Sequence, residues 1–254
     1  MKKILLSACA ILVASATFAQ LRVAEILQRD ATKHVTNISP TVSPFTSVVA
    51  SAPIIIHTDD FSNAANWVID HDQTASSLDW QIGSNSCTGS YPTADILSTT
   101  ASNGWAMIDS DAYGGATGGT EVEDCWLTMA TPVDLNGYPN VNVEFETNYR
   151  SYNSELPYIV VGIGDGLGNV TWPDLDPLTD ISTMTNVFIP FPGYASGDAT
   201  TNPELIAVNI SPALVGLTST ELADIHIRFH WTGTWGYAWF VDDFAISELP
   251  DNLV

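Results

Sequence analysis

A strict two-residue alternation of apolar and polar side chains limits what this chain can fold into. Over residues 141–150, Val, Val, Phe, Thr and Tyr occupy the odd positions, and Asn, Glu, Glu, Asn and Arg occupy the even ones. Residues 225–231 repeat the pattern, with Ile, Ile, Phe and Trp on one face and His, Arg and His on the other. Because successive side chains of a β-strand point to opposite faces, residues 141–149 and 225–231 are each predicted to be a strand with one buried face.

Shorter strand signals follow one another along the chain and are separated by turn residues. They cover residues 54–57, 80–82, 106–109, 126–129, 158–163, 187–191, 206–210 and 238–246. Weak helical patterns are confined to residues 204–208 and 212–223. Many short strands joined by long Gly- and Asp-rich loops predict an all-β fold, a two-sheet β-sandwich of jelly-roll type.

The N-terminus has the form of a signal peptide over residues 1–19. Lys2 and Lys3 precede an apolar run, and Thr17-Phe18-Ala19 provides a small-x-small cleavage site. Residues 6–9 also match a lipobox, but the apolar run continues past Cys9, which favours the cleaved peptide. No later apolar run reaches the ~18 residues of a membrane span. We therefore expect a secreted or cell-surface protein without membrane insertion.

The remaining chain divides by composition. Residues 20–53 include a Ser-, Thr-, Pro- and Val-rich tract that is typical of an extended leader or linker. The folded unit is expected over residues 54–248. Residues 249–254 are then a tail or the start of a missing downstream region.

The chain is strongly acidic. Its formal charge is −22, and loss of Lys2 and Lys3 with the signal peptide would lower it to −24. Beyond Lys33, the only lysine or arginine residues are Arg150 and Arg228. Such a charge repels nucleic acid and anionic lipid and attracts cations. It indicates solubility outside the cell, binding of divalent cations, or both.

Two pairs of adjacent acids lie near the two ends of the expected folded unit. Asp59 and Asp60 follow the first strand signal, and Asp242 and Asp243 lie within the last one. The first and last strands of a jelly roll often lie side by side, so the pairs could converge and supply hard oxygen ligands for calcium. Alternatively, one aspartate of each pair points to solvent and the other caps a turn.

Asp109 and Asp111, with the glycine-rich stretch after them, form a second candidate calcium site. The glycine and glutamate spacing of an EF-hand is absent. An ordinary long acidic loop explains the pattern equally well.

Glu144 and Glu146 raise the question of catalysis. On one strand face they would lie roughly 6–7 Å apart, a separation compatible with the acid/base pair of a glycosidase. Their neighbours are Asn142, Asn148 and Arg150 rather than further acids and tryptophans. A polar face with a Glu146–Arg150 salt link is therefore the favoured interpretation.

The tryptophans divide by context. Trp67, Trp80, Trp105, Trp126 and Trp231 are expected to pack in the core. Trp235 lies in a short turn and Trp172 in a loop, where burial is harder. Exposed loop aromatics can stack on sugars or anchor a protein partner, so these two are the candidate ligand contacts.

Cys87 and Cys125 are the two cysteines of the expected mature chain. An oxidising compartment would allow them to form a disulfide. Sequence alone does not establish whether their Cβ atoms meet.

Four stretches in order resemble a known family: HTDDFSNAANWVIDHD with LDWQIG, NGWAMIDSDAYG, NVEFETNYR and RFHWTGTWGYAWFVDDFAI. They look like the choice-of-anchor-J and cleaved-adhesin modules of secreted Bacteroidota proteins, which are distantly similar to MAM domains. The resemblance spans about residues 54–247. It implies a lectin-like jelly roll with a role in adhesion, often with structural calcium, and Asp60 and Asp243 match the family's recurrent acidic positions.

Proteins with such modules commonly end in a type IX secretion sorting domain, and none follows residue 248 here. We therefore expect a fragment of a longer adhesin or protease, or another export route. The expected function is a non-enzymatic, calcium-stabilised module that binds a glycan or a surface protein. The alternatives are a sandwich glycoside hydrolase or lyase using Glu144 and Glu146, and a structural spacer within a larger surface protein.

Overall fold

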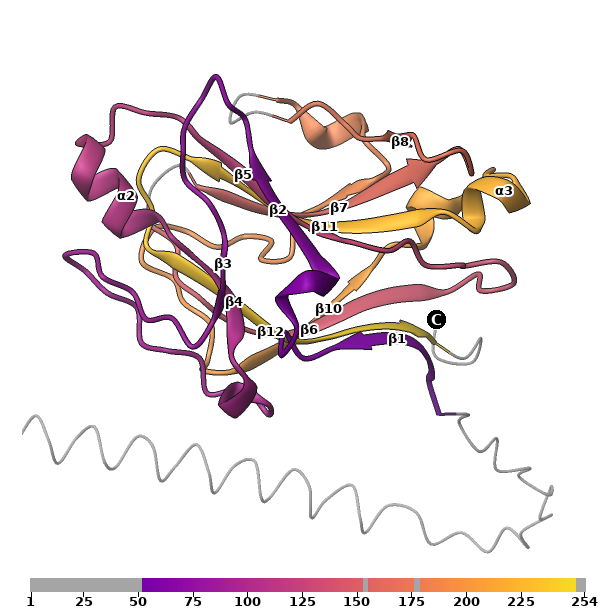
Figure 1. Cartoon of the computed structure of the whole chain (residues 1–254), viewed down its shortest axis with the longest axis horizontal. Helices are drawn as coiled ribbons and strands as arrows, with labels where there is room; N and C mark the ends of the chain where they lie inside the picture. The colour runs from indigo at the N-terminus through magenta and orange to yellow at the C-terminus, as the bar shows by residue number, and fades with distance from the viewer. Residues whose placement is uncertain (1–51, 153–154, 176–178, 250–254) are drawn as a thin grey trace, which may run out of the picture. The chain divides into compact units, whose positions relative to one another are not determined.

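The computed structural model describes residues 52–152, 155–175 and 179–249, so the predicted signal peptide and most of the predicted leader lie outside the described residues. Two antiparallel sheets face each other (Figure 1). The first sheet contains β10 (Glu204–Asn209), β6 (Val141–Tyr149), β12 (Ala238–Glu248), β4 (Trp105–Asp109) and β3 (Gln81–Gly83) in that order, with β1 (Ile54–Asp59) also beside β12. The second contains β2 (Trp67–His71), β5 (Glu123–Met129), β11 (Ile225–Gly233), β7 (Leu156–Gly164) and β8 (Val170–Thr171), with β9 (Val187–Phe188) also beside β7.

The chain crosses between the sheets at most steps, which confirms the predicted jelly-roll β-sandwich. β1, β4, β6, β10 and β12 lie in one sheet, whereas β2, β5, β7 and β11 lie in the other. Short helices occur at opposite ends of the sandwich: α2 (Ser110–Thr117) and α3 (Ser219–Leu222) (Figure 1). None of the helices in the described part of the chain is long and apolar enough to cross a bilayer.

The core lies between the two sheets and is rich in aromatic rings. The alternation of β6 and β11 places Phe145, Phe229 and Trp231 inside with no solvent exposure. Phe229 contacts Phe145 edge to face at 5.2 Å and Trp239 of β12 at 5.6 Å. Burial of each such side chain stabilises the fold by about 2–3 kcal/mol, so the aromatic contacts account for much of the attraction between the sheets.

Strand β12 carries a bulge at the acidic pair. Opposite β6, Asp242 pairs with Glu146 and Ala245 with Glu144, so β12 contains one extra residue. Asp243 adopts a φ of 49°, which aspartate tolerates better than most residues. On its other edge, β12 pairs with β4 before the bulge and with β1 after it. The predicted neighbourhood of the first and last strands is thus confirmed.

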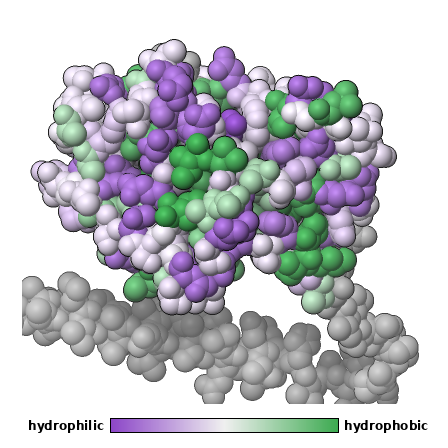
Figure 2. Space-filling model, viewed as in Figure 1, coloured by the Kyte–Doolittle hydropathy of each residue, from purple (hydrophilic) through white to green (hydrophobic). Residues whose placement is uncertain are grey.

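Loops cover parts of the outer faces of both sheets. On the β12 sheet, Ile96 packs against Trp105, Met107 and Phe240. On the β11 sheet, Leu175 packs against Tyr158 and Val160 of β7 and against Val187 of β9. On the face shown in Figure 2, hydrophobic residues form separate patches among hydrophilic ones, as is usual for a folded surface.

Two predictions need correction, and the disulfide that the sequence left open is absent. Residues 110–117 form helix α2 rather than a loop, with Asp109 as its N-cap and Gly118 in the left-handed conformation after it. Trp126 lies on the outer face of β5, where it stacks against Arg228, because it has the opposite parity to the core residue Leu127. The disulfide is not formed: Cys125 lies in the main core and Cys87 beside the outer Ile96 cluster, both as free thiols.

Candidate functional site

A pocket of about 330 Å³ opens where several strand ends meet. β4 ends at Asp109, β6 at Tyr149 and β11 at Gly233, and β12 begins at Ala238. Four segments far apart in the sequence supply its lining: Tyr91, Asp111, Tyr152, Trp235, Gly236 and Tyr237. The pocket therefore combines four aromatic side chains with one carboxylate, and it includes the predicted ligand contact Trp235.

Trp235 is fixed by a hydrogen bond and by close packing on α2. Its Nε1 donates to Oδ1 of Asp111 at 3.2 Å. Its ring lies against Gly114 and Gly119, and a Cβ atom on Gly114 would lie 2.5 Å from Cγ and Cδ1 of the indole. Glycine at 114 is therefore what allows the ring to approach the helix. This contact holds the indole at the pocket wall.

Asp111 connects the helix to the opposite wall. It is 3 % exposed, and its Oδ2 accepts a hydrogen bond from the backbone N of Tyr91 at 2.5 Å. Asp109 accepts hydrogen bonds from Ala112 N at 3.1 Å and from Thr88 N at 2.6 Å. Both aspartates thus order the pocket through protein donors, and their role as calcium ligands stays a prediction.

The remaining rings lie at the rim. Tyr91 is 64 % exposed and Tyr152 is 46 % exposed. Tyr152 meets Tyr237 edge to face at 5.2 Å, and the guanidinium of Arg150 lies 4.0 Å from the centre of the Tyr237 ring. Arg150 therefore braces the aromatic rim rather than making the predicted salt link to Glu146.

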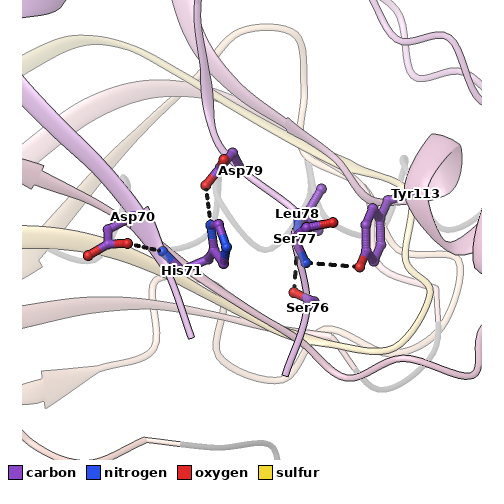
Figure 3. A network of polar contacts seen from close by, with 7 residues as sticks. All are labelled: Asp70, His71, Ser76, Ser77, Leu78, Asp79 and Tyr113. Atoms are coloured by element: carbon purple, nitrogen blue, oxygen red, sulfur yellow. Dashed lines mark hydrogen bonds and ion pairs between the residues drawn. The ribbon is translucent and has the colours of Figure 1, made fainter. Parts of the chain in front are cut away.

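A network of polar contacts links α2 to the segment that follows β2 (Figure 3). The hydroxyl of Tyr113 accepts a hydrogen bond from Ser77 N at 3.0 Å and donates one to Glu121. At the end of β2, His71 Nδ1 lies 2.7 Å from Oδ1 of Asp79. These contacts tie the 71–79 segment to α2 and to β2, so the helix that supports Trp235 has polar contacts besides those with the pocket.

One aspartate of each acidic pair contacts the same short segment, which consists of Thr100 and the Ala101–Asn103 turn after it. Asp60 accepts a hydrogen bond from Nδ2 of Asn103 at 2.9 Å, and Asp243 accepts one from Thr100 N at 3.0 Å. Asp242 is fully buried and accepts a hydrogen bond from Ser98 Oγ at 2.5 Å. Burial raises the pKa of Asp242 to about 6. The predicted convergence therefore holds for Asp60 and Asp243, whose partners are protein donors. It does not hold for Asp59, whose hydrogen bonds go to residues 61–67.

Glu144 and Glu146 lie away from the aromatic pocket. Glu144 accepts a hydrogen bond from Ser247 Oγ at 2.7 Å. Glu146 accepts hydrogen bonds from Thr99 N at 2.6 Å and from Thr99 Oγ1 at 2.7 Å. Both carboxylates therefore hold neighbouring segments on the outer face of the sheet.

Trp172, the other predicted ligand contact, is part of a different surface. Its ring lies against Gly162, and the guanidinium of Arg228 stacks between it, at 3.6 Å, and Trp126, at 4.7 Å. Arg228 also donates from Nε to Thr128 Oγ1 at 3.0 Å. Trp172 therefore secures its loop to the outer face of β11, and a ligand contact there stays a prediction.

Sequence reasoning missed Tyr91, Tyr152 and Tyr237. Tyr237 lies two residues after Trp235, and this local signal could have identified it. Tyr91 and Tyr152 carry no such signal, because only the strand topology brings them to the pocket.

Comparison with protein-family models and with curated proteins finds no match. Among solved structures, the chain is similar to the family 11 carbohydrate-binding module of Clostridium thermocellum in complex with a mixed-linked tetrasaccharide. The two chains are 12 % identical, the match covers 78 % of this chain and 96 % of that one, and the TM-score is 0.41. It is also similar to the K1 cleaved adhesin domain of Lys-gingipain from Porphyromonas gingivalis, with 15 % identity, coverage of 76 % and 98 %, and a TM-score of 0.39. Against tailspike protein 4 of bacteriophage CBA120, identity is 10 %, the TM-score is 0.40, and 75 % of this chain matches only 20 % of the phage chain.

Proposed function

We propose that this chain is a non-catalytic module that binds a saccharide in the Trp235 pocket. The observation that supports the proposal is the lining itself, four aromatic side chains around one ordered carboxylate. Aromatic faces stack on the apolar C–H faces of sugars, and a few fixed polar groups orient the hydroxyls. Both oxygens of Asp111 already accept hydrogen bonds, which suits a residue that orients rather than one that transfers protons.

The setting that we propose is extracellular. The signal-peptide pattern of residues 1–19 supports export, and the charge of −22 supports solubility there. A saccharide on a cell surface or on a glycoprotein is then the partner. Adhesion to such a surface is the role that we infer for the module.

Removal of either exposed tyrosine tests the pocket with little risk to folding. We expect Tyr91→Ala and Tyr152→Ala to weaken saccharide binding at least about fivefold, because each removes a stacking surface. Their melting temperatures should stay near that of the parent, since neither residue belongs to the buried core and Tyr91 and Tyr152 are 64 % and 46 % exposed. A glycan array followed by calorimetry on its strongest neutral binder measures the effect.

Leu167→Ala is the matched control, because Leu167 is an 87 % exposed apolar residue that does not line the pocket. It should bind like the parent. Parent-like affinity in both tyrosine variants, or an array without any binder, would refute the pocket as the saccharide site.

We also propose that a calcium ion binds between Asp60 and Asp243 and stabilises the fold, independently of the saccharide pocket. Support comes from the contacts of both carboxylates with the Thr100–Asn103 segment. Within the described residues, no three His, Cys, Asp or Glu side chains are arranged to hold a metal ion. The ion would therefore have to replace the Thr100 and Asn103 donors and take its other ligands from carbonyl and hydroxyl oxygens.

Chelation tests this second proposal. We expect EDTA to lower the melting temperature of the parent by about 5–10 °C, the loss for an ion present at roughly 100 times its Kd. Asp243→Asn should melt lower than the parent in calcium and show little further change in EDTA. Equal melting curves of the parent with calcium and with EDTA would exclude the ion.

A further inference from the structure

A buried carboxyl group lies beneath the pocket. Glu123 of β5 has no solvent exposure. Its Oε2 accepts hydrogen bonds from Trp231 Nε1 at 2.8 Å and from Ser110 Oγ at 2.7 Å. Its Oε1 is buried without a hydrogen-bond partner among the described residues. A neutral acid with its proton on Oε1 suits this site better than a carboxylate, whose charge would have only two donors.

Ser110 connects this carboxyl group to the pocket. The same Ser110 Oγ that donates to Glu123 accepts a hydrogen bond from the backbone N of Gly236 at 2.6 Å. Gly236 lines the pocket between Trp235 and Tyr237. A Cβ atom on Gly236 would lie 3.0 Å both from Cδ of Glu155 and from Cζ2 of Trp231, so the turn lies tightly on this layer. A movement of the Ser110 hydroxyl would therefore move Gly236 and, with it, the neighbouring rings of Trp235 and Tyr237.

The charged and titratable groups around Glu123 are mainly acidic. Glu155, from the segment before β7, opposes ionisation and itself interacts with the buried Tyr149 hydroxyl of β6. On β5 itself, Asp124 pairs with His230 of β11, and the Cys125 thiol lies in the core. No ion pair to Glu123 is formed within the described residues. On the α2 side, the carboxylates of Asp109 and Asp111 face other donors.

We propose that Glu123 is a positioning residue for the pocket: as a neutral acid it holds the 234–237 turn through Ser110, and its ionisation loosens that turn and weakens binding. The inference rests on the proposed function for its binding consequence. Its structural part, the coupling of Glu123 to the turn, is independent of any ligand. Burial, with a smaller contribution from Glu155, raises the pKa of Glu123 to about 7, so the change falls near neutral pH.

Nuclear magnetic resonance of the ligand-free protein tests the coupling. Between pH 5.5 and 8.5, the Gly236 amide and the indole N–H signals of Trp231 and Trp235 should shift together with one midpoint near 7. In Glu123→Gln, which mimics the neutral acid, all three should stay flat. In Ser110→Ala, the Trp231 signal should still titrate while the Gly236 and Trp235 signals no longer follow it.

Binding of the strongest neutral array glycan tests the consequence. If only the neutral form binds, the affinity of the parent falls about tenfold from pH 6 to pH 8, whereas Glu123→Gln changes less than twofold. Three results would overturn the proposal: no midpoint between pH 6 and 8 in the parent, titration of Trp231 without Gly236 and Trp235, or the same pH profile in Glu123→Gln. Failure of glycan binding with the coupled titration intact would refute the proposed function alone.

Discussion

The Gly114→Ala variant is expected to lose saccharide binding more completely than either tyrosine variant. The new Cβ would lie 2.5 Å from Cγ and Cδ1 of Trp235 and 2.9 Å from its Cβ. These atoms are the rigid base of the indole, so the ring must leave the helix and with it the hydrogen bond to Asp111. We expect a loss of affinity of roughly 30-fold or more, as for a central contact, and a stability cost of about 1–3 kcal/mol from overpacking.

The next residue of the same helix supplies the control. A Cβ on Gly115 would lie 4.0 Å from Cζ2 of Trp235, an ordinary contact. Gly115→Ala should therefore bind like the parent and be slightly more stable, because alanine favours the helix by about 1 kcal/mol. Calorimetry and melting of the two variants side by side measure the difference. Equal affinities would show that the position of Trp235 does not matter for binding.

The fold could be predicted further than the site because its signals are local. The alternation of β6 and β11 is complete within each strand, and the structure gives β6 the predicted bounds, Val141–Tyr149. Helix α2 escaped prediction since Gly114 and Gly115 weaken any helical pattern. Its start is set by the Asp109 cap, and its packing depends on Trp235, which lies more than 110 residues away in sequence.

The acidic residues show why the chemistry of a site is harder to predict than its location. The adjacency of the first and last strands could be inferred, and Asp60 and Asp243 do approach one turn. Which groups satisfy them depends on where the loop with Ser98 and Thr100 runs, and no local pattern encodes that path. A carboxylate that accepts loop amides and one that binds a cation look the same in sequence.

Asp59→Ala is expected to destabilise the fold by about 2–4 kcal/mol, because Asp59 fills the turn-capping role that the sequence offered as the alternative to a metal ligand. Asp59 Oδ1 accepts hydrogen bonds from Trp67 Nε1 and from Phe61 N, both at 2.9 Å, and Oδ2 accepts one from Asn66 Nδ2 at 2.6 Å. The variant leaves the buried indole N–H of Trp67 without this acceptor. It also frees the Phe61 backbone, which is held at a φ of 53° while its ring stacks on Trp67 at 4.8 Å.

Urea unfolding of Asp59→Ala beside Asp72→Ala separates this role from a generic loss of charge. Asp72 also accepts two local hydrogen bonds, from Thr74 N and Thr74 Oγ1 at 2.8 Å, but neither donor is buried. Its loss should cost clearly less free energy of unfolding than the loss of Asp59, because solvent can replace the aspartate. The loss of unfolding free energy in Asp59→Ala should persist in EDTA, since it comes from the missing hydrogen bonds to Trp67 and Phe61. A deficit that disappears on chelation would instead identify Asp59 as a cation ligand, and a deficit equal to that of Asp72→Ala would remove the special role of the buried indole.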